Sequence, residues 1–447
     1  MRVFIQMLGG LLLLAIILVG FKYRHTIFDK SAVNSDGAGS SVAVLEGALS
    51  GGDGTILVLD HTAKIYGFGE NNRGQVDFGM AYTITRPTAL LSEESAILPA
   101  PQWARVHAGD GASYMISRDG NLWRRPFRPS TLGMVRKPQR TVDFGNARLF
   151  AEINPSLKWK KAEQMWRVGA GITRDDQLYF WRESSLLERD DQQRRDPNNA
   201  YPQPEDPFAA PQMLKRLGTA DGDKWQDFCI GMGLIYAVAN DGTLWFSGNL
   251  SGVLSAGSKD DVPKAEATKL TQVNVAAKLK RIYCRANAQQ VLALDNTAQL
   301  WGFGLNTFGE VGDGDGDPFK ARKKIPREAM QKVTDKRWVA IALAPSSSFG
   351  ISTDGALWAW GQDVDWKEGP TDGNASSAPV LIDKTRKWAA VTSTHNARAA
   401  LTADGKLFTW GSNRSGALGD GNVASRRDAL TAVDSAVEWK NSLTESK

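Results

Sequence analysis

One short motif occurs seven times in the chain and limits what it can fold into. The motif is an Asp, usually a Gly, a variable residue, an aliphatic residue and an aromatic residue, as in residues 354–358 (DGALW) and 404–408 (DGKLF). The aliphatic residues of the seven copies lie about 57 residues apart on average. They are Ile65, Leu122, Leu178, Leu244, Leu300, Leu357 and Leu407. Such even spacing predicts seven copies of one supersecondary unit.

Each unit has the pattern of about four short strands. An apolar run precedes the Asp-Gly turn and another follows it, which predicts a hairpin. A further strand lies upstream and often opens with Trp, as at Trp338 and Trp388, and a weaker strand lies downstream. The 44 Gly and 15 Trp of the chain fit Gly-rich turns between aromatic strands. The sequence therefore predicts an all-β fold, a seven-bladed β-propeller of four-stranded blades over residues 42–440.

The ends of this region predict how the ring closes. Residues 41–48 supply an apolar strand before the first hairpin, and residues 438–440 (EWK) resemble the start of another first strand. We expect both ends to meet at one blade.

A Gly-rich turn after the hairpin carries a family resemblance. Residues 410–419 (WGSNRSGALG), 303–312 (FGLNTFGEVG) and 68–76 (FGENNRGQV) resemble the signature of the regulator of chromosome condensation repeat family. Repeats 2 and 3 keep only the hairpin, and residues 124–126 (RRP) replace the turn in repeat 2. The resemblance implies a seven-bladed propeller that interacts with proteins; it does not imply nucleotide exchange, because a fold does not fix a function.

The turn and strand residues of this signature have structural explanations. An Asn in a turn can bond nearby backbone groups, so we expect that role for the Asn of each signature. We expect Trp358 and Trp410 to pack between blades.

The N-terminus reads as a membrane anchor. Residues 3–21 are apolar except for Gln6 and, at about 1.5 Å per residue, nearly span a hydrocarbon core of about 30 Å. Bulky and basic residues follow, whereas a cleavage site needs small ones, so an uncleaved transmembrane helix is favoured over a signal peptide. We expect an anchor over 1–25, a flexible linker over 26–41 and a C-terminal tail over 441–447. A single-pass protein of a bacterial inner membrane with an extracytoplasmic propeller is the resulting expectation.

Charge and cysteine content exclude several classes of protein. A net charge of +5 over 447 residues gives no reason to expect nucleic-acid binding. Two cysteines cannot form a disulfide framework or a four-thiolate zinc site. Cys229 and Cys284 fall at equivalent positions of adjacent units, and we expect buried free thiols there, with a disulfide as the alternative.

No stretch of the chain has the pattern of a catalytic, cofactor or metal site. There is no nucleophile elbow, P-loop or zinc-protease helix. Residues 313–317 (DGDGD) resemble a calcium loop but lack its downstream Glu, and the same turn recurs at residues 419–422. We expect no metal, no cofactor and no enzyme. The alternative is an extracytoplasmic carbohydrate-active or other hydrolytic propeller, which a channel mouth lined by Arg, Glu and Tyr would favour over a scaffold.

Two loops differ most from the repeat framework and are the candidate binding surface. Residues 186–211 lengthen the third interval and include Arg194, Arg195, Tyr201 and Phe208. Residues 319–327 contain five basic residues that could attract an acidic partner or anionic lipid headgroups. These are Lys320, Arg322, Lys323, Lys324 and Arg327. The predicted function is a membrane-anchored, non-enzymatic scaffold that binds an unidentified partner protein through its loops.

Overall fold

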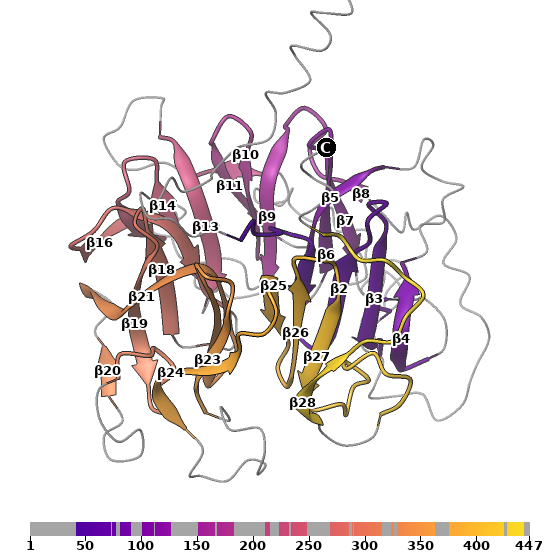
Figure 1. The fold of residues 1–447 in the computed structure, drawn as a ribbon. Helices are drawn as coiled ribbons and strands as arrows, with labels where there is room; N and C mark the ends of the chain where they lie inside the picture. The colour runs from indigo at the N-terminus through magenta and orange to yellow at the C-terminus, as the bar shows by residue number, and fades with distance from the viewer. Residues whose placement is uncertain are drawn as a thin grey trace, which may run out of the picture. The chain divides into compact units, whose positions relative to one another are not determined.

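The computed structural model describes a compact unit that lies within Ser40–Lys447 (Figure 1). The residues it describes are 42–72, 74–76, 81–90, 101–110, 112–126, 151–165, 168–182, 211–214, 223–231, 234–247, 269–285, 288, 290–314, 323–325, 329–362, 375–423 and 427–441. The predicted anchor and linker lie outside them. Among the described residues no helix is long and apolar enough to cross a membrane.

The described part is all-β, as predicted, and its strands form antiparallel sets in chain order. In the first three sets the strands are β1 (Leu49–Gly51), β2 (Thr55–Leu59), β3 (Ile65–Glu70) and β4 (Thr83–Ala89); β5 (Trp103–Ala108), β6 (Ala112–Ser117), β7 (Leu122–Pro126) and β8 (Ala151–Glu152); β9 (Trp159–Met165), β10 (Val168–Thr173), β11 (Leu178–Arg182) and β12 (Gln212–Met213). In each set, consecutive strands pair with each other.

The middle of the chain forms one larger sheet of twelve strands. Its strands are β13 (Trp225–Gly231), β14 (Leu234–Ala239), β15 (Leu244–Phe246), β16 (Thr271–Val275), β17 (Leu279–Tyr283), β18 (Gln290–Asp295), β19 (Gln299–Asn306), β20 (Lys323–Ile325), β21 (Ala329–Leu343), β22 (Ser347–Ser352), β23 (Leu357–Gly361) and β24 (Ser376–Asp383). The long strand β21 joins two sets, because its first half pairs with β19 and its second half with β22.

The last set closes against the first. It consists of β25 (Trp388–Ser393), β26 (Ala397–Thr402), β27 (Leu407–Gly411) and β28 (Arg427–Ala432). Strand β1 contacts β25 and β26, and the yellow strands lie beside the indigo ones in Figure 1. A bridge between Asp60 and Trp439 ties the C-terminal segment to the first hairpin. The two ends thus meet at the first set, as predicted, although its first strand is Leu49–Gly51 rather than residues 41–48.

The hairpin turns follow from the repeated Asp motif. In four of them the residue after Asp is a Gly with φ between 81° and 88°, a left-handed conformation that costs Gly nothing. These residues are Gly120, Gly242, Gly355 and Gly405. Copies without this Gly place Ala63, Asp176 or Ala298 in the same region of φ. In four copies a Ser or Thr two residues before the Asp donates its hydroxyl to the carboxylate, as Ser352 does to Asp354.

The Asn of each Gly-rich turn bonds the backbone, as predicted. Its side-chain oxygen accepts the backbone N–H five residues later, at 2.8 Å for Asn71, 2.9 Å for Asn306 and 3.0 Å for Asn413. The amide nitrogens of Asn306 and Asn413 donate to Asp313 and Asp420, each at 3.0 Å. Asp313 therefore has the same place in its turn as Asp420, which accounts for it without calcium.

Tryptophans fill the space between neighbouring sets. Trp225, Trp338, Trp360, Trp388 and Trp410 are all at most 1% exposed. The prediction that Trp410 is a packing residue is confirmed. Trp358 is only half-buried; its indole nitrogen bonds Ser352 and the Lys336 ammonium lies over its ring. Trp358 is therefore also a packing residue, although less buried than Trp410: it packs against the core cluster that contains Trp338, with the two ring centroids 6.3 Å apart.

Candidate functional site: the central channel

The first strands of the sets surround a channel. Strand β1 contacts β5, β5 contacts β9, and the contacts continue through β13, β17, β21 and β25 back to β1. We call these the inner strands. The residues at their carboxyl ends line a cavity of about 410 Å³, and among them are Gly52, Met165, Arg285 and Ser393. We call this end of the channel the mouth.

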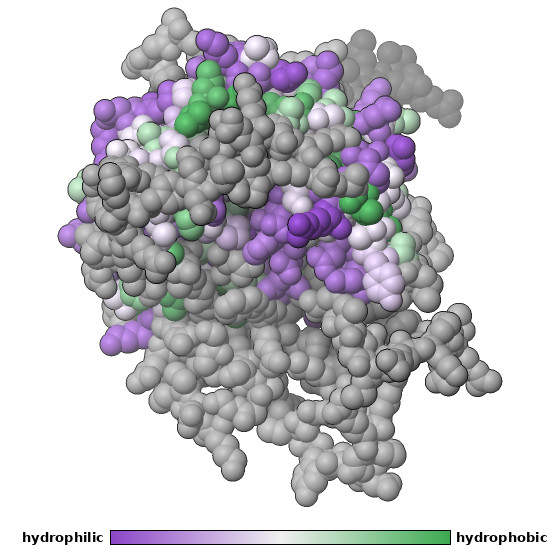
Figure 2. All heavy atoms as spheres, turned by 90° about the horizontal axis from the view of Figure 1, so that it is seen from below, coloured by the Kyte–Doolittle hydropathy of each residue, from purple (hydrophilic) through white to green (hydrophobic). Residues whose placement is uncertain are grey.

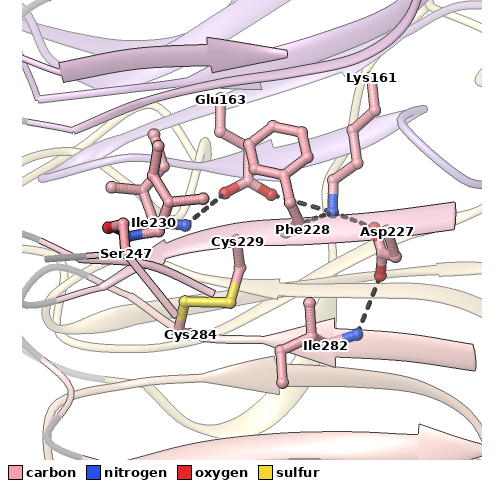
Figure 3. The surroundings of a disulfide bond; sticks show 10 residues. Lys161, Glu163, Asp227, Phe228, Cys229, Ile230, Ser247, Ile282 and Cys284 are labelled. Atoms are coloured by element: carbon pink, nitrogen blue, oxygen red, sulfur yellow. Dashed lines mark hydrogen bonds and ion pairs between the residues drawn. A yellow bond between two sulfur atoms is a disulfide. The ribbon is translucent and has the colours of Figure 1, made fainter. Parts of the chain in front are cut away.

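A half-buried lysine links three inner strands beside the cavity (Figure 3). The ammonium of Lys161 on β9 lies 2.7 Å from Asp227 and 3.1 Å from Glu163, and it donates to the backbone oxygen of Phe228. Asp227 accepts the backbone N–H of Ile282 on β17 at 2.9 Å. Burial alone would lower the pKa of Lys161, but the attraction of Asp227 and Glu163 is stronger and raises it. Lys161 is therefore a permanent cation here.

A second ion pair crosses the channel. Arg281 on β17 pairs with Glu46, which precedes β1 and also accepts from Arg105 on β5 at 3.0 Å. Strands β1 and β17 are not neighbours in the cycle of inner strands, so this pair spans the channel. Burial would raise the pKa of Glu46, but Arg281 and Arg105 hold it below its usual value.

Arg285 crosses the channel again, at the mouth. Its guanidinium donates to the backbone oxygen of Gly52 at 2.6 Å and to both the backbone and hydroxyl oxygens of Ser393. These partners follow β1 and end β25, whereas Arg285 follows β17. Burial lowers the pKa of Arg285 to about 10, against the attraction of Asp53 and Asp110, so the side chain stays charged at neutral pH.

His107 forms part of the same wall and is held neutral. Its Nε2 lies 3.2 Å from the backbone oxygen of Gln164 on the neighbouring inner strand. Burial lowers the pKa of His107, and the nearby carboxylate of Glu163 opposes this only in part.

The two cysteines form a disulfide, so the expectation of free thiols is wrong. Cys229 on β13 and Cys284 directly after β17 are bonded, with their Cα atoms 5.6 Å apart. Adjacent inner strands bring equivalent positions within the range that a disulfide requires. The pairing depends on the spacing between sets, which neither local sequence pattern reveals.

The predicted binding loops lie outside the described residues. Arg194, Arg195, Tyr201, Phe208, Lys320, Arg322 and Arg327 are not described, and Lys323 and Lys324 are described only as backbone of β20. The strands that lead to these two loops end at the same edge of their sets as the mouth. Arg182 at the end of β11 pairs with Val168, which pairs with Met165 at the mouth. Asn306 ends β19 at the same edge as the turn from β17 to β18, because antiparallel strands alternate in direction.

The polar side chains of the channel are functional candidates that sequence reasoning missed. Equivalent positions of the inner strands hold different residue types, so no repeated motif marks these side chains.

The view from below in Figure 2 shows the outer surface at one end of the sheets, where hydrophilic residues lie between grey atoms and described apolar residues form small separate groups.

Comparison with known proteins identifies the repeat. The Regulator of chromosome condensation (RCC1) repeat matches residues 404–429. No curated protein matches the sequence. The structure is similar to Prp20p from Saccharomyces cerevisiae, described with its binding to Gsp1p and histones, with a TM-score of 0.59, 14% identity and coverage of 89% of this chain and 88% of that chain. Yeast RCC1 (Prp20) bound by Kap60 gives the same TM-score and identity, covering 92% and 91%. Human WBSCR16 has a TM-score of 0.43 and 14% identity, covering 91% and 85%.

Closely paired antiparallel sets around a channel define a β-propeller. One segment of the chain matches the RCC1 repeat and the fold is similar to that of Prp20p, and both findings support a β-propeller of the RCC1 type.

Proposed function

We propose that this protein is a membrane-anchored, non-enzymatic scaffold with a seven-bladed β-propeller that binds a partner protein at the channel mouth. The observation that carries the proposal is the arrangement of charges in the channel. Arg281, Lys161 and Arg285 bond groups of this same chain across several inner strands, so they brace the ring. A braced ring can present loops with little loss of conformational entropy on binding.

The loops at 186–211 and 319–327 are the proposed contact. The strands that lead into both end at the mouth edge, so one partner can reach both loops and the channel rim together. Prp20p, which has the same fold, binds Gsp1p and histones; from this we infer only the kind of partner, a protein. Residues 3–21 anchor the chain, and anionic lipid headgroups are a further candidate contact of the basic loop.

An extracytoplasmic propeller is part of this proposal. Disulfides persist in oxidising compartments and are rare in the cytosol. The Cys229–Cys284 bond supports placing the propeller on the oxidising side of a bacterial inner membrane.

Crosslinking in native membranes followed by mass spectrometry would identify the partner and test the loops. One variant shortens residues 186–211 to a Gly-Ser bridge, and a second replaces the five basic residues of 319–327 by Gln. The matched control replaces five exposed lysines near the hairpin turns, at the opposite edge, by Gln: Lys64, Lys224, Lys278, Lys387 and Lys406. Both loop variants should lose partner capture while the control keeps it. Equal capture by all three would refute loop binding.

One observation favours a second candidate, a hydrolytic enzyme. The mouth is lined by Arg285, Glu163 and Tyr283, the three residue types that favour an enzyme over a scaffold. However, the ammonium of Lys161 lies within salt-bridge distance of both Glu163 and Asp227, which keeps these two carboxylates from acting as a free acid and base. Turnover of chromogenic glycosides or esters that is lost in Glu163→Gln would favour the enzyme.

A further inference from the structure

The Cys229–Cys284 disulfide lies at the wall of the cavity. Both cysteines line it, together with Lys161 and Arg285. The two sulfur-bearing side chains differ in exposure: Cys229 is 1% exposed, whereas Cys284 is half-buried. A small molecule in the cavity can therefore approach the disulfide from the side of Cys284.

The residue after Cys284 is Arg285, whose side chain spans the mouth. Arg285 bonds the backbone oxygens of Gly52 and Ser393, so the position of Cys284 sets where this guanidinium reaches. Cys284 and Ser393 each pack closely against a glycine. A Cβ on Gly231 would lie 2.9 Å from the Cβ of Cys284, and one on Gly51 would lie 2.2 Å from the backbone oxygen of Ser393.

We propose that Cys229–Cys284 is a thiol-exchange site that opens onto the cavity, and that the bond holds Arg285 in place across the mouth. The substrate class is a small thiol. Its thiolate attacks the sulfur of Cys284, the S–S bond breaks, and Cys229 leaves as a thiolate. A second thiol then releases the first as a symmetric disulfide, so two thiols supply the two electrons and both cysteines end reduced.

The Cys284 side is the attacked side for a steric reason. Exchange needs the attacking sulfur to reach its target, and access controls its rate. Cys229 is 1% exposed within the apolar cluster that contains Tyr236 and Leu292, whereas Cys284 is half-buried at the edge of that cluster, so a thiol in the cavity reaches Cys284 more readily.

Two single variants of the full chain test the direction of attack. Cys229→Ser leaves Cys284 free, and Cys284→Ser leaves Cys229 free. With oxidised glutathione as the probe, under native conditions, Cys229→Ser should form the mixed disulfide at least about tenfold faster than Cys284→Ser. Both should react equally after unfolding in urea. Equal native rates, or no native reaction in either variant, would overturn the proposal.

Hydrogen exchange of the wild type tests the link to Arg285. Reduction with dithiothreitol should increase exchange in residues 51–53 and 391–393, which hold the partners of Arg285. Arg285→Gln should give the same increase while the disulfide is intact, and reduction of that variant should add nothing further. Independent, additive increases would show that the disulfide does not hold the arginine.

Discussion

The indole nitrogen of Trp360 donates to the backbone oxygen of Glu310, 3.0 Å away in the preceding set. Glu310 follows the Gly of the signature turn, so a core tryptophan of one set satisfies the turn of the set before it. The hydroxyl of Ser348 donates to the same oxygen at 2.7 Å. The turn of one set therefore contacts the tryptophan of the next set, and the first prediction tests this contact.

Trp360→Ala should lower the free energy of unfolding by about 3–5 kcal/mol, because it removes a fully buried ring and leaves a cavity. Trp358→Ala is the matched control, since that ring is half-buried on the same strand, and should cost clearly less. Urea denaturation followed by circular dichroism measures both. Equal midpoints would mean that Trp360 does not pack between sets.

Arg125 has the place in repeat 2 that tryptophan has in repeat 6. It is 1% exposed, and its guanidinium donates to the backbone oxygens of Gly74, Gln75 and Val76 in the preceding turn. Gln75 follows its turn Gly as Glu310 follows Gly309. The departure from the signature at residues 124–126 therefore keeps the contact to the preceding turn with a different donor.

Arg125→Met should be destabilising, by about 1–3 kcal/mol for each buried carbonyl left without a donor. Arg125→Lys has a single nitrogen in place of the fork and should fall between Met and wild type. Thermal unfolding of the three proteins gives the order. A Met variant as stable as wild type would show that water replaces the guanidinium.

The repeated motifs made the sheets and turns predictable from the sequence, but they did not reveal the polar side chains of the channel. The hairpins, the Asn turns and the buried Trp410 follow from residues that recur at fixed offsets. Lys161, Asp227 and Arg281 occupy equivalent inner-strand positions but include charges of both signs, and their pairing depends on which strands meet. The disulfide and the exposure of Trp358 also depend on distances between strands.

Removing the charge of Lys161 alone should lower the free energy of unfolding more than removing it together with the charges of Asp227 and Glu163. Lys161→Met leaves the largely buried carboxylates of Asp227 and Glu163 without their cation, and since Lys161 is 26% exposed the cost should be below the about 3–5 kcal/mol of a fully buried pair. Adding Asp227→Asn and Glu163→Gln to this variant should recover much of the loss. Urea midpoints of the single and triple variants check this, and a triple variant weaker than the single would contradict it.

His107 should make stability depend on pH. Burial lowers its pKa in the folded protein, so between that value and about 6.5 the unfolded chain binds more protons and stability falls as the pH falls. His107→Gln should therefore lose less stability than the wild type between pH 7 and 5. Urea denaturation at each pH measures both proteins. Parallel slopes for the two would rule out His107 as the source.

The full chain should stay with membranes after an alkaline carbonate wash, because residues 3–21 form an apolar run of spanning length. A chain beginning at residue 26 should be released, and the two forms together separate insertion from lipid contact by the basic loop. Replacing Leu12 and Leu14 by Arg should also release the full chain, since a charge at the centre of the span is costly to insert. N-terminal sequencing of the membrane fraction should find residue 1 or 2. A start beyond residue 21 would instead identify residues 3–21 as a cleaved signal peptide and remove the anchor from the proposed function.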